Sequence, residues 1–114
     1  MAFDVFPSEL ELSSFFETGP ELLKDTVLTY KRAYQDETLF CSFSPDYGDI
    51  DLTLLHLDKQ KLVLSLSHVH QVQVLQHAGR EQLKVSFQPG TLLRNFLLVV
   101  KPEVTIIWGT TLGN

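Results

Sequence analysis

Hydrophobic residues near the start of the chain follow a helical spacing. Leu12, Phe15 and Phe16 lie at positions i, i+3 and i+4 of segment 7–17, so a helix would carry them on one face. A proline at the start, acidic residues in the first turn and a Gly-Pro pair after the segment are typical of helix boundaries. The pattern predicts one short helix that packs on a sheet, although alternating leucines at its start also permit a strand.

From residue 25 onward, apolar and polar residues alternate with the period of two that is typical of strands. The clearest runs are 27–30, 39–43, 50–57, 62–66, 72–74, 83–87, 96–100 and 104–108. Polar or Pro- and Gly-containing turns separate most of these runs, as at 34–37, 44–49 and 77–81. The phase shifts at Leu55, which predicts a β-bulge, and segment 96–100 is apolar on both faces, which predicts a central strand.

These elements predict a mostly β (α+β) fold. We expect an antiparallel meander sheet or a small two-layer sheet of about seven or eight strands, with one short N-terminal helix, because no helices alternate with the strands to connect parallel neighbours. A chain of 114 residues and 13.0 kDa is long enough for one hydrophobic core. We therefore expect a single domain over residues 1–114.

The single cysteine, Cys41, excludes an intramolecular disulfide and a cysteine-based zinc site. It alternates with Leu39 and Phe43, which predicts a buried thiol. The N-terminus has no basic stretch followed by an apolar run, and no run of about 18 apolar residues occurs. We therefore expect a cytoplasmic protein without a membrane partner.

Charge is distributed unevenly along the chain, which has a formal net charge of −5. Residues 1–51 contain eleven acidic and three basic residues, net −8, and the remainder has a net charge of +3. A negative surface repels phosphate backbones and attracts basic proteins. Nucleic acid is therefore not expected as a partner, whereas a basic protein is, although acidic surfaces also serve solubility alone.

Residues that could carry chemistry do not form a recognisable catalytic motif. The chain has no P-loop, G-x-S-x-G elbow, dinucleotide fingerprint or H-E-x-x-H, so we expect no enzyme activity and no cofactor. His68 and His70 alternate on a predicted strand and are weak candidates for metal ligands. Because other ligand types do not cluster near them, no metal site is predicted.

Acidic residues surround Gly48 in a predicted turn, but they do not follow the EF-hand pattern of ligands. Tyr47 lies among them, where a large ring has little reason to be buried unless a partner docks there. By contrast, Trp108 follows an apolar run and is expected in the core. The candidate partner-binding residues are Glu9, Glu11, Asp46, Tyr47, Asp49 and Asp51.

Four parts of the chain together resemble a known class of protein. They are the short segment Phe6-Pro7-Ser8-Glu9-Leu10, the alternating run Ile50-Asp51-Leu52-Thr53-Leu54, the hairpin 72–87 and the last strands 96–108. In spacing and alternation the chain resembles the small β-rich immunity proteins of bacterial polymorphic and contact-dependent toxin systems. The resemblance implies a protein that binds a cognate toxin and blocks its active site, and it assigns no individual residues.

Three hypotheses for the function follow. The first is a non-catalytic immunity-type inhibitor that binds and neutralises a basic cognate toxin. The second is a structural or assembly subunit of a phage or secretion apparatus, which forms a homo-oligomer through exposed strand edges. The third is a small-ligand or metal-binding module that uses the four histidines. The sequence leaves open whether the chain forms a homodimer.

Overall fold

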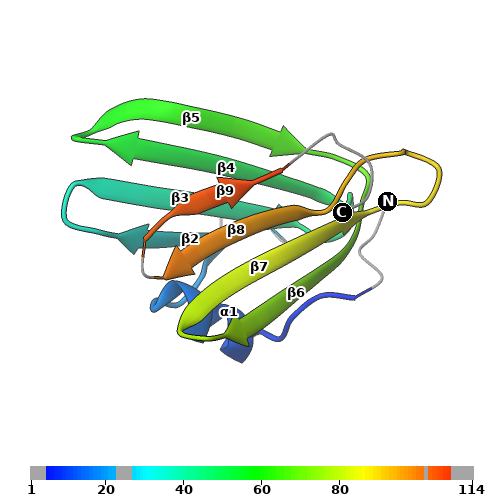
Figure 1. Cartoon of the computed structure of the whole chain (residues 1–114), viewed down its shortest axis with the longest axis horizontal. Coiled ribbons are helices and arrows are strands. Elements are labelled where there is room, and N and C mark those ends of the chain that lie inside the picture. Colours follow the sequence, from blue (N-terminus) through cyan, green and yellow to red (C-terminus); the bar gives the residue numbers. More distant parts are fainter. Residues whose placement is uncertain (1–4, 23–26, 102, 109–114) are drawn as a thin grey trace.

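Two antiparallel sheets face each other around one hydrophobic core (Figure 1). The computed structural model describes residues 5–22, 27–101 and 103–108, within which the chain forms one helix and nine strands. The first sheet has the order β1-β2-β3-β4-β5 and the second has the order β6-β7-β8-β9. Strands that follow one another in the chain are therefore neighbours in each sheet. The predicted antiparallel, mostly β fold is confirmed; of the two expected arrangements the chain adopts the two-layer one, in which each layer is a meander.

The elements have the following bounds: α1 Glu9–Phe16, β1 Glu21–Leu22, β2 Leu28–Ala33, β3 Glu37–Ser44, β4 Asp49–His56, β5 Lys59–Leu66, β6 Val69–His77, β7 Arg80–Phe87, β8 Phe96–Lys101 and β9 Thr105–Ile107. In the described part of the chain, no helix has the length and apolar character needed to cross a membrane.

Helix α1 begins at a capping box formed by Ser8 and Glu11. The Glu11 backbone N–H donates to the Ser8 hydroxyl at 3.1 Å, and the Ser8 N–H donates to the Glu11 carboxylate at 3.0 Å. The predicted apolar face, Leu12, Phe15 and Phe16, is buried. The helix packs against β2 of the first sheet and β6 of the second and thus bridges the two sheets along one side of the molecule (Figure 1).

The core lies between the sheets and consists of inward-facing side chains from both. In the first sheet, register places Leu28, Phe43, Ile50 and Leu66 in one cross-strand row. Cys41 belongs to the next row and is fully buried, as predicted. Burial raises the pKa of its thiol well above the ordinary value of 9.0.

Two features of the fold differ from the sequence expectation. Runs 62–66 and 72–74 keep the same phase of alternation, but the strand breaks at 67–68, where the chain leaves the first sheet and enters the second. His68 lies at this break with a φ of 60°. The short strand β1 was also not predicted, which gives nine strands in the described residues. The predicted bulge at Leu55 is confirmed by a register shift between Leu54 and Leu55.

Candidate protein-binding surface

The six candidate partner-binding residues fall into two separate groups. Glu9 and Glu11 lie exposed on α1, which packs on β2 and β6. The other four, Asp46, Tyr47, Asp49 and Asp51, lie in the β3–β4 turn and along β4. The structure therefore does not bring all six into one site. The carboxylate of Glu11 also has a local role, since it caps the helix.

The turn between β3 and β4 presents Tyr47 to solvent. The backbone N–H groups of Tyr47 and Gly48 both donate to the Ser44 carbonyl, at 3.1 and 2.9 Å. Gly48 has a φ of 73°, a conformation that glycine adopts without strain. Tyr47 is 67% exposed, and Asp46 beside it is exposed as well. A large amphipathic ring next to a carboxylate is a combination suited to protein binding.

The two remaining acids lie where β4 leaves this turn. Asp49 is half-buried opposite Ser44, whereas Asp51 is exposed on the outer face of the first sheet. The hydroxyl of Ser65, on β5, donates to the Asp51 carboxylate at 2.7 Å. Asp51 is therefore held in place by its neighbouring strand, and its second oxygen can accept a further donor.

Three connections meet at this end of the molecule, which we call the loop end: residues 45–48, 67–68 and 88–95. The N–H of Val69 donates to the Gly48 carbonyl at 3.0 Å, and the N–H of Gln88 donates to the His68 carbonyl at 2.8 Å. The loop between β7 and β8 extends from the right-hand side of Figure 1. The hydrogen bonds place this loop beside the connection that carries His68, and that connection beside the Tyr47 turn.

The loop 88–95 exposes two adjacent leucines that were not among the candidate partner-binding residues. Leu92 is 94% exposed and Leu93 is 44% exposed. The loop is fixed from within, because the Thr91 hydroxyl donates to the Gln88 carbonyl at 2.8 Å. The available sequence signal was a leucine pair one residue after Pro89-Gly90, in a segment that alternation alone treats only as the end of a strand.

Trp108 lies at the surface, which corrects the expectation of a core position. It is 39% exposed, and its ring stacks on Phe87 at 5.8 Å and meets Phe96 edge-on at 5.6 Å. Its indole N–H donates to the Arg94 carbonyl at 2.9 Å. The apolar run before Trp108 predicted burial, but the indole N–H needs a partner, and the loop backbone supplies it. Trp108 thereby fixes the loop 88–95 from outside.

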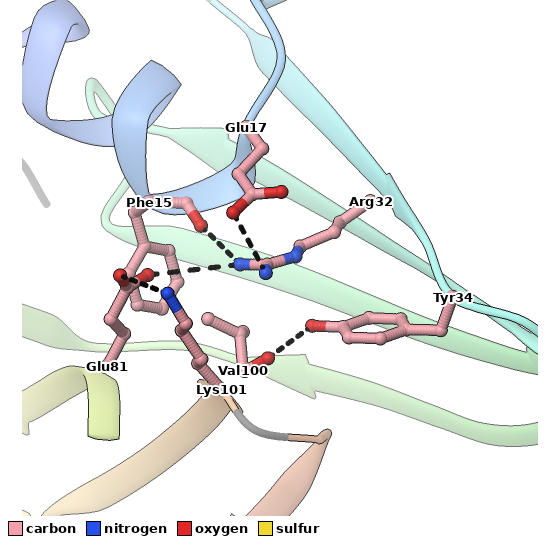
Figure 2. A network of polar contacts seen from close by, with 7 residues as sticks. All are labelled: Phe15, Glu17, Arg32, Tyr34, Glu81, Val100 and Lys101. Carbon is pink, nitrogen blue, oxygen red and sulfur yellow. Dashed lines mark hydrogen bonds and ion pairs between the residues drawn. The ribbon is translucent and has the colours of Figure 1, made fainter. Parts of the chain in front are cut away.

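A polar network around Arg32 joins elements of both sheets to the helix (Figure 2). The Arg32 side chain is 10% exposed, and its Nη1 donates to the Phe15 carbonyl at 2.8 Å. It forms ion pairs with Glu17 at 3.2 Å and with Glu81 at 3.9 Å, and Glu81 also lies 3.9 Å from Lys101. Arg32 thus connects α1, β2 and β7, and its guanidinium is engaged in holding the fold.

Tyr34 adds a direct link between the sheets in the same network (Figure 2). Its hydroxyl donates to the Val100 carbonyl on β8 at 2.6 Å, and the Arg32 guanidinium lies 5.2 Å from its ring centroid. Burial raises the pKa of Tyr34 above its ordinary value of 10.0, and the nearby Arg32 cation opposes part of that rise. The hydroxyl therefore remains a donor over the physiological pH range.

The histidines do not gather into a metal site in the part of the chain that the structure describes. His68 is exposed and His70 is half-buried on β6, while His56 pairs with Glu37 at 3.6 Å. No group of three or more His, Cys, Asp or Glu side chains among the described residues could hold a metal ion. The side chain of His77 lies outside the described part.

Comparison with known proteins gives one informative match. No protein-family model matches the chain, and no curated protein matches it. A chain of the solved "Contact-dependent growth inhibition toxin - immunity protein complex from Klebsiella pneumoniae 342" has a similar fold, with a TM-score of 0.88 and 21% sequence identity. The match covers 96% of this chain and 98% of that chain. At this identity the likeness establishes a common fold, and it agrees with the resemblance drawn from the sequence pattern.

Proposed function

We propose that the chain is a non-catalytic immunity-type protein that binds and neutralises a cognate toxin. The observation that carries the proposal is the fold shared with a chain of a toxin–immunity complex over 96% of this chain and 98% of the other. The excess of acidic residues favours the inhibitor over the toxin, because a toxin that acts on nucleic acid must attract phosphates. The partner in this proposal is a basic protein.

Binding is assigned to the loop end, with Tyr47 as an anchor and Asp46, Asp49 and Asp51 around it. Exposed acids accelerate association with a basic surface, and a desolvated aromatic ring supplies affinity. Glu9 and Glu11 lie on another element and contribute to the overall negative field. Neutralisation requires the chain to be in the compartment that the toxin attacks, which we propose is the bacterial cytoplasm.

The test begins with capture of the tagged chain from its native host at low salt and identification of the protein recovered with it. The captured protein is then produced in a bacterial test strain, alone and together with this chain. We expect growth arrest in the first case, growth in the second, and a complex with equal amounts of both proteins.

Two outcomes would contradict the proposal. A captured protein that leaves growth unaffected when produced alone is not a toxin, and the neutralising function would then be wrong. Recovery of the chain by itself as a large defined oligomer would instead favour an assembly subunit. Sedimentation of the purified chain also tests whether it forms a homodimer.

A further inference from the structure

Leu92 has a left-handed backbone conformation outside any helix end or two-residue hairpin turn. Positive φ angles occur at six non-glycine residues in the described part of the chain: Glu17, Leu57, Asp58, His68, Ala78 and Leu92. Local geometry accounts for the other five. Glu17 ends α1, His68 lies where the chain changes sheets, and the remaining three occupy two-residue hairpin turns, which need positive φ. Leu92, with a φ of 63°, lies in the longer loop 88–95, where the Leu93 N–H donates across it to the Thr91 hydroxyl at 3.4 Å.

The side chain of Leu92 gains nothing from the core that would offset this conformation. Left-handed backbone is unfavourable for residues with a Cβ, and Leu92 is 94% exposed. The loop is nevertheless held, by the Thr91 hydroxyl on the Gln88 carbonyl at 2.8 Å and by the Trp108 indole on the Arg94 carbonyl at 2.9 Å. An exposed apolar side chain in a fixed and strained loop is typical of a binding element. Because the loop is already ordered in the free protein, binding costs less conformational entropy.

The surroundings of the loop indicate the chemistry of the partner. The Gln88 and Val69 N–H groups link the loop to the Tyr47 turn through His68 and Gly48. Asp46 and Asp49 lie at that turn, and Arg94 is the cation within the loop. Two backbone hydrogen bonds thus connect the loop that exposes the leucines, through residues 68 and 69, to the turn that carries Tyr47 and Asp46. Apolar and acidic side chains at one end of a molecule match the apolar centre and polar rim of a protein interface. The complementary surface has an apolar pocket surrounded by basic side chains.

We propose that Leu92 and Leu93 form the apolar anchor of the interface and insert into an apolar pocket on the basic partner. The cationic rim of that pocket faces Asp46 and Asp49. This inference rests on the proposed function, since the partner is the toxin. The sequence identified the binding surface only by its charges and by Tyr47. The inference adds the leucine pair as a second source of binding affinity on that surface.

The experiment compares Leu92→Gly with Leu57→Gly in binding to the recombinant captured toxin. Leu57 is the matched control, because it is 65% exposed, has a φ of 50° and lies in the β4–β5 turn rather than at the loop end. Glycine relieves the backbone in both variants, so both should melt at or above the wild-type temperature. We expect only Leu92→Gly to bind weaker, by about tenfold or more, chiefly through faster dissociation.

The outcomes separate the inference from the function on which it rests. Equal affinity of both variants and the wild type would overturn the leucine anchor and leave the immunity function standing. A wild-type chain that binds no growth-inhibiting protein would overturn the function and the anchor with it. A homodimer that Leu92→Gly dissociates, with toxin affinity unchanged, would assign the leucines to a second copy of the chain and would also overturn the proposal.

Discussion

Arg32 is the charged residue on which the arrangement of helix and sheets depends most directly. Its side chain is 10% exposed, and it contacts the Phe15 carbonyl as well as the carboxylates of Glu17 and Glu81. A nearly buried guanidinium with several partners is difficult to replace, because each partner left without a donor retains its desolvation penalty.

Arg32→Lys should therefore lower the free energy of unfolding by about 1–3 kcal/mol, because one ammonium group cannot reproduce a planar fork of donors. Urea denaturation followed by tryptophan fluorescence measures the change. Lys31→Arg is the control, since Lys31 is exposed and should tolerate replacement. An equal loss in both variants would show that the Arg32 contacts contribute no special stability.

Buried thiol and phenol groups should make the fold sensitive to alkali. Burial raises the pKa of Cys41 well above 9.0 and that of Tyr34 above 10.0, so the unfolded chain loses these protons first. Their contribution to stability is complete below about pH 9 and is lost as pH rises through the higher folded values. We expect the free energy of unfolding to fall steadily above pH 9 in urea titrations.

In this pH range, Tyr34→Phe isolates one of three groups, because burial also raises the pKa of Tyr30 above its ordinary value of 10.0. The variant lacks the hydroxyl that donates to Val100, which should lower stability by about 1 kcal/mol at neutral pH. Its free energy of unfolding should decline less steeply than that of the wild type above pH 10. A slope identical to the wild type would mean that Tyr34 takes no part in the alkaline transition.

At the scale of elements, α1 depends on its capping box for a defined start. The helix is only eight residues long, which is too short for stability from its own hydrogen bonds. Ser8→Ala removes the acceptor of the Glu11 N–H and should lower the free energy of unfolding by about 1 kcal/mol. Ser14→Ala, at an exposed position within the same helix, should leave stability unchanged or slightly raised. A similar loss in both would exclude capping as the cause.

Alternation in the sequence was sufficient to predict most of these elements. The helix with its buried Leu12, Phe15 and Phe16, the turns within 34–37, 44–49 and 77–81, and the bulge after Leu54 all follow from local patterns. The break at 67–68 could not be predicted, because apolar residues keep the same spacing on both sides of it. The same alternation continues from Leu28 and Tyr30 to Arg32, so an inward-facing arginine could have been expected there.

The binding surface could be predicted only in part. A polar turn predicts exposure of Asp46 and Tyr47, and both are exposed. The exposure of the leucine pair at 92 and 93 could not be predicted, because exposure in a loop depends on what packs beside it. Here the loop is held by Trp108, which lies outside it in the sequence. Binding by these residues depends also on the surface of the partner. The sequence of this chain contains no information about that surface.

For the molecule as a whole, the negative field should control how fast a basic partner arrives. Asp46→Lys combined with Asp49→Lys reverses two charges at the loop end and should slow association by about tenfold at low salt, with a weaker salt dependence. Stopped-flow mixing with the recombinant toxin measures the rate. The control is Asp36→Lys with Asp58→Lys, which changes the net charge by the same amount. These two residues lie in two other turns, which the hydrogen bond from the Leu57 N–H to the Asp36 carbonyl joins.

Comparison of the two double variants distinguishes a local surface from a general field. A markedly slower association for the loop-end variant alone supports the assigned surface. Equal slowing by both would attribute the effect to net charge, and association at the wild-type rate in the loop-end variant would show that Asp46 and Asp49 do not face the partner.

The meander order also has a consequence for the chain while it is being synthesised. Every strand of the first sheet has its partners within residues 21–66, so this sheet can pair before β6 leaves the ribosome. Its inner face, with Leu39 and Leu52, is then covered only in part, by α1 through Phe16 on Tyr30 and Phe43, until the second sheet follows. The net charge of −8 on residues 1–51 should keep such half-finished chains apart on a polysome, because like charges repel.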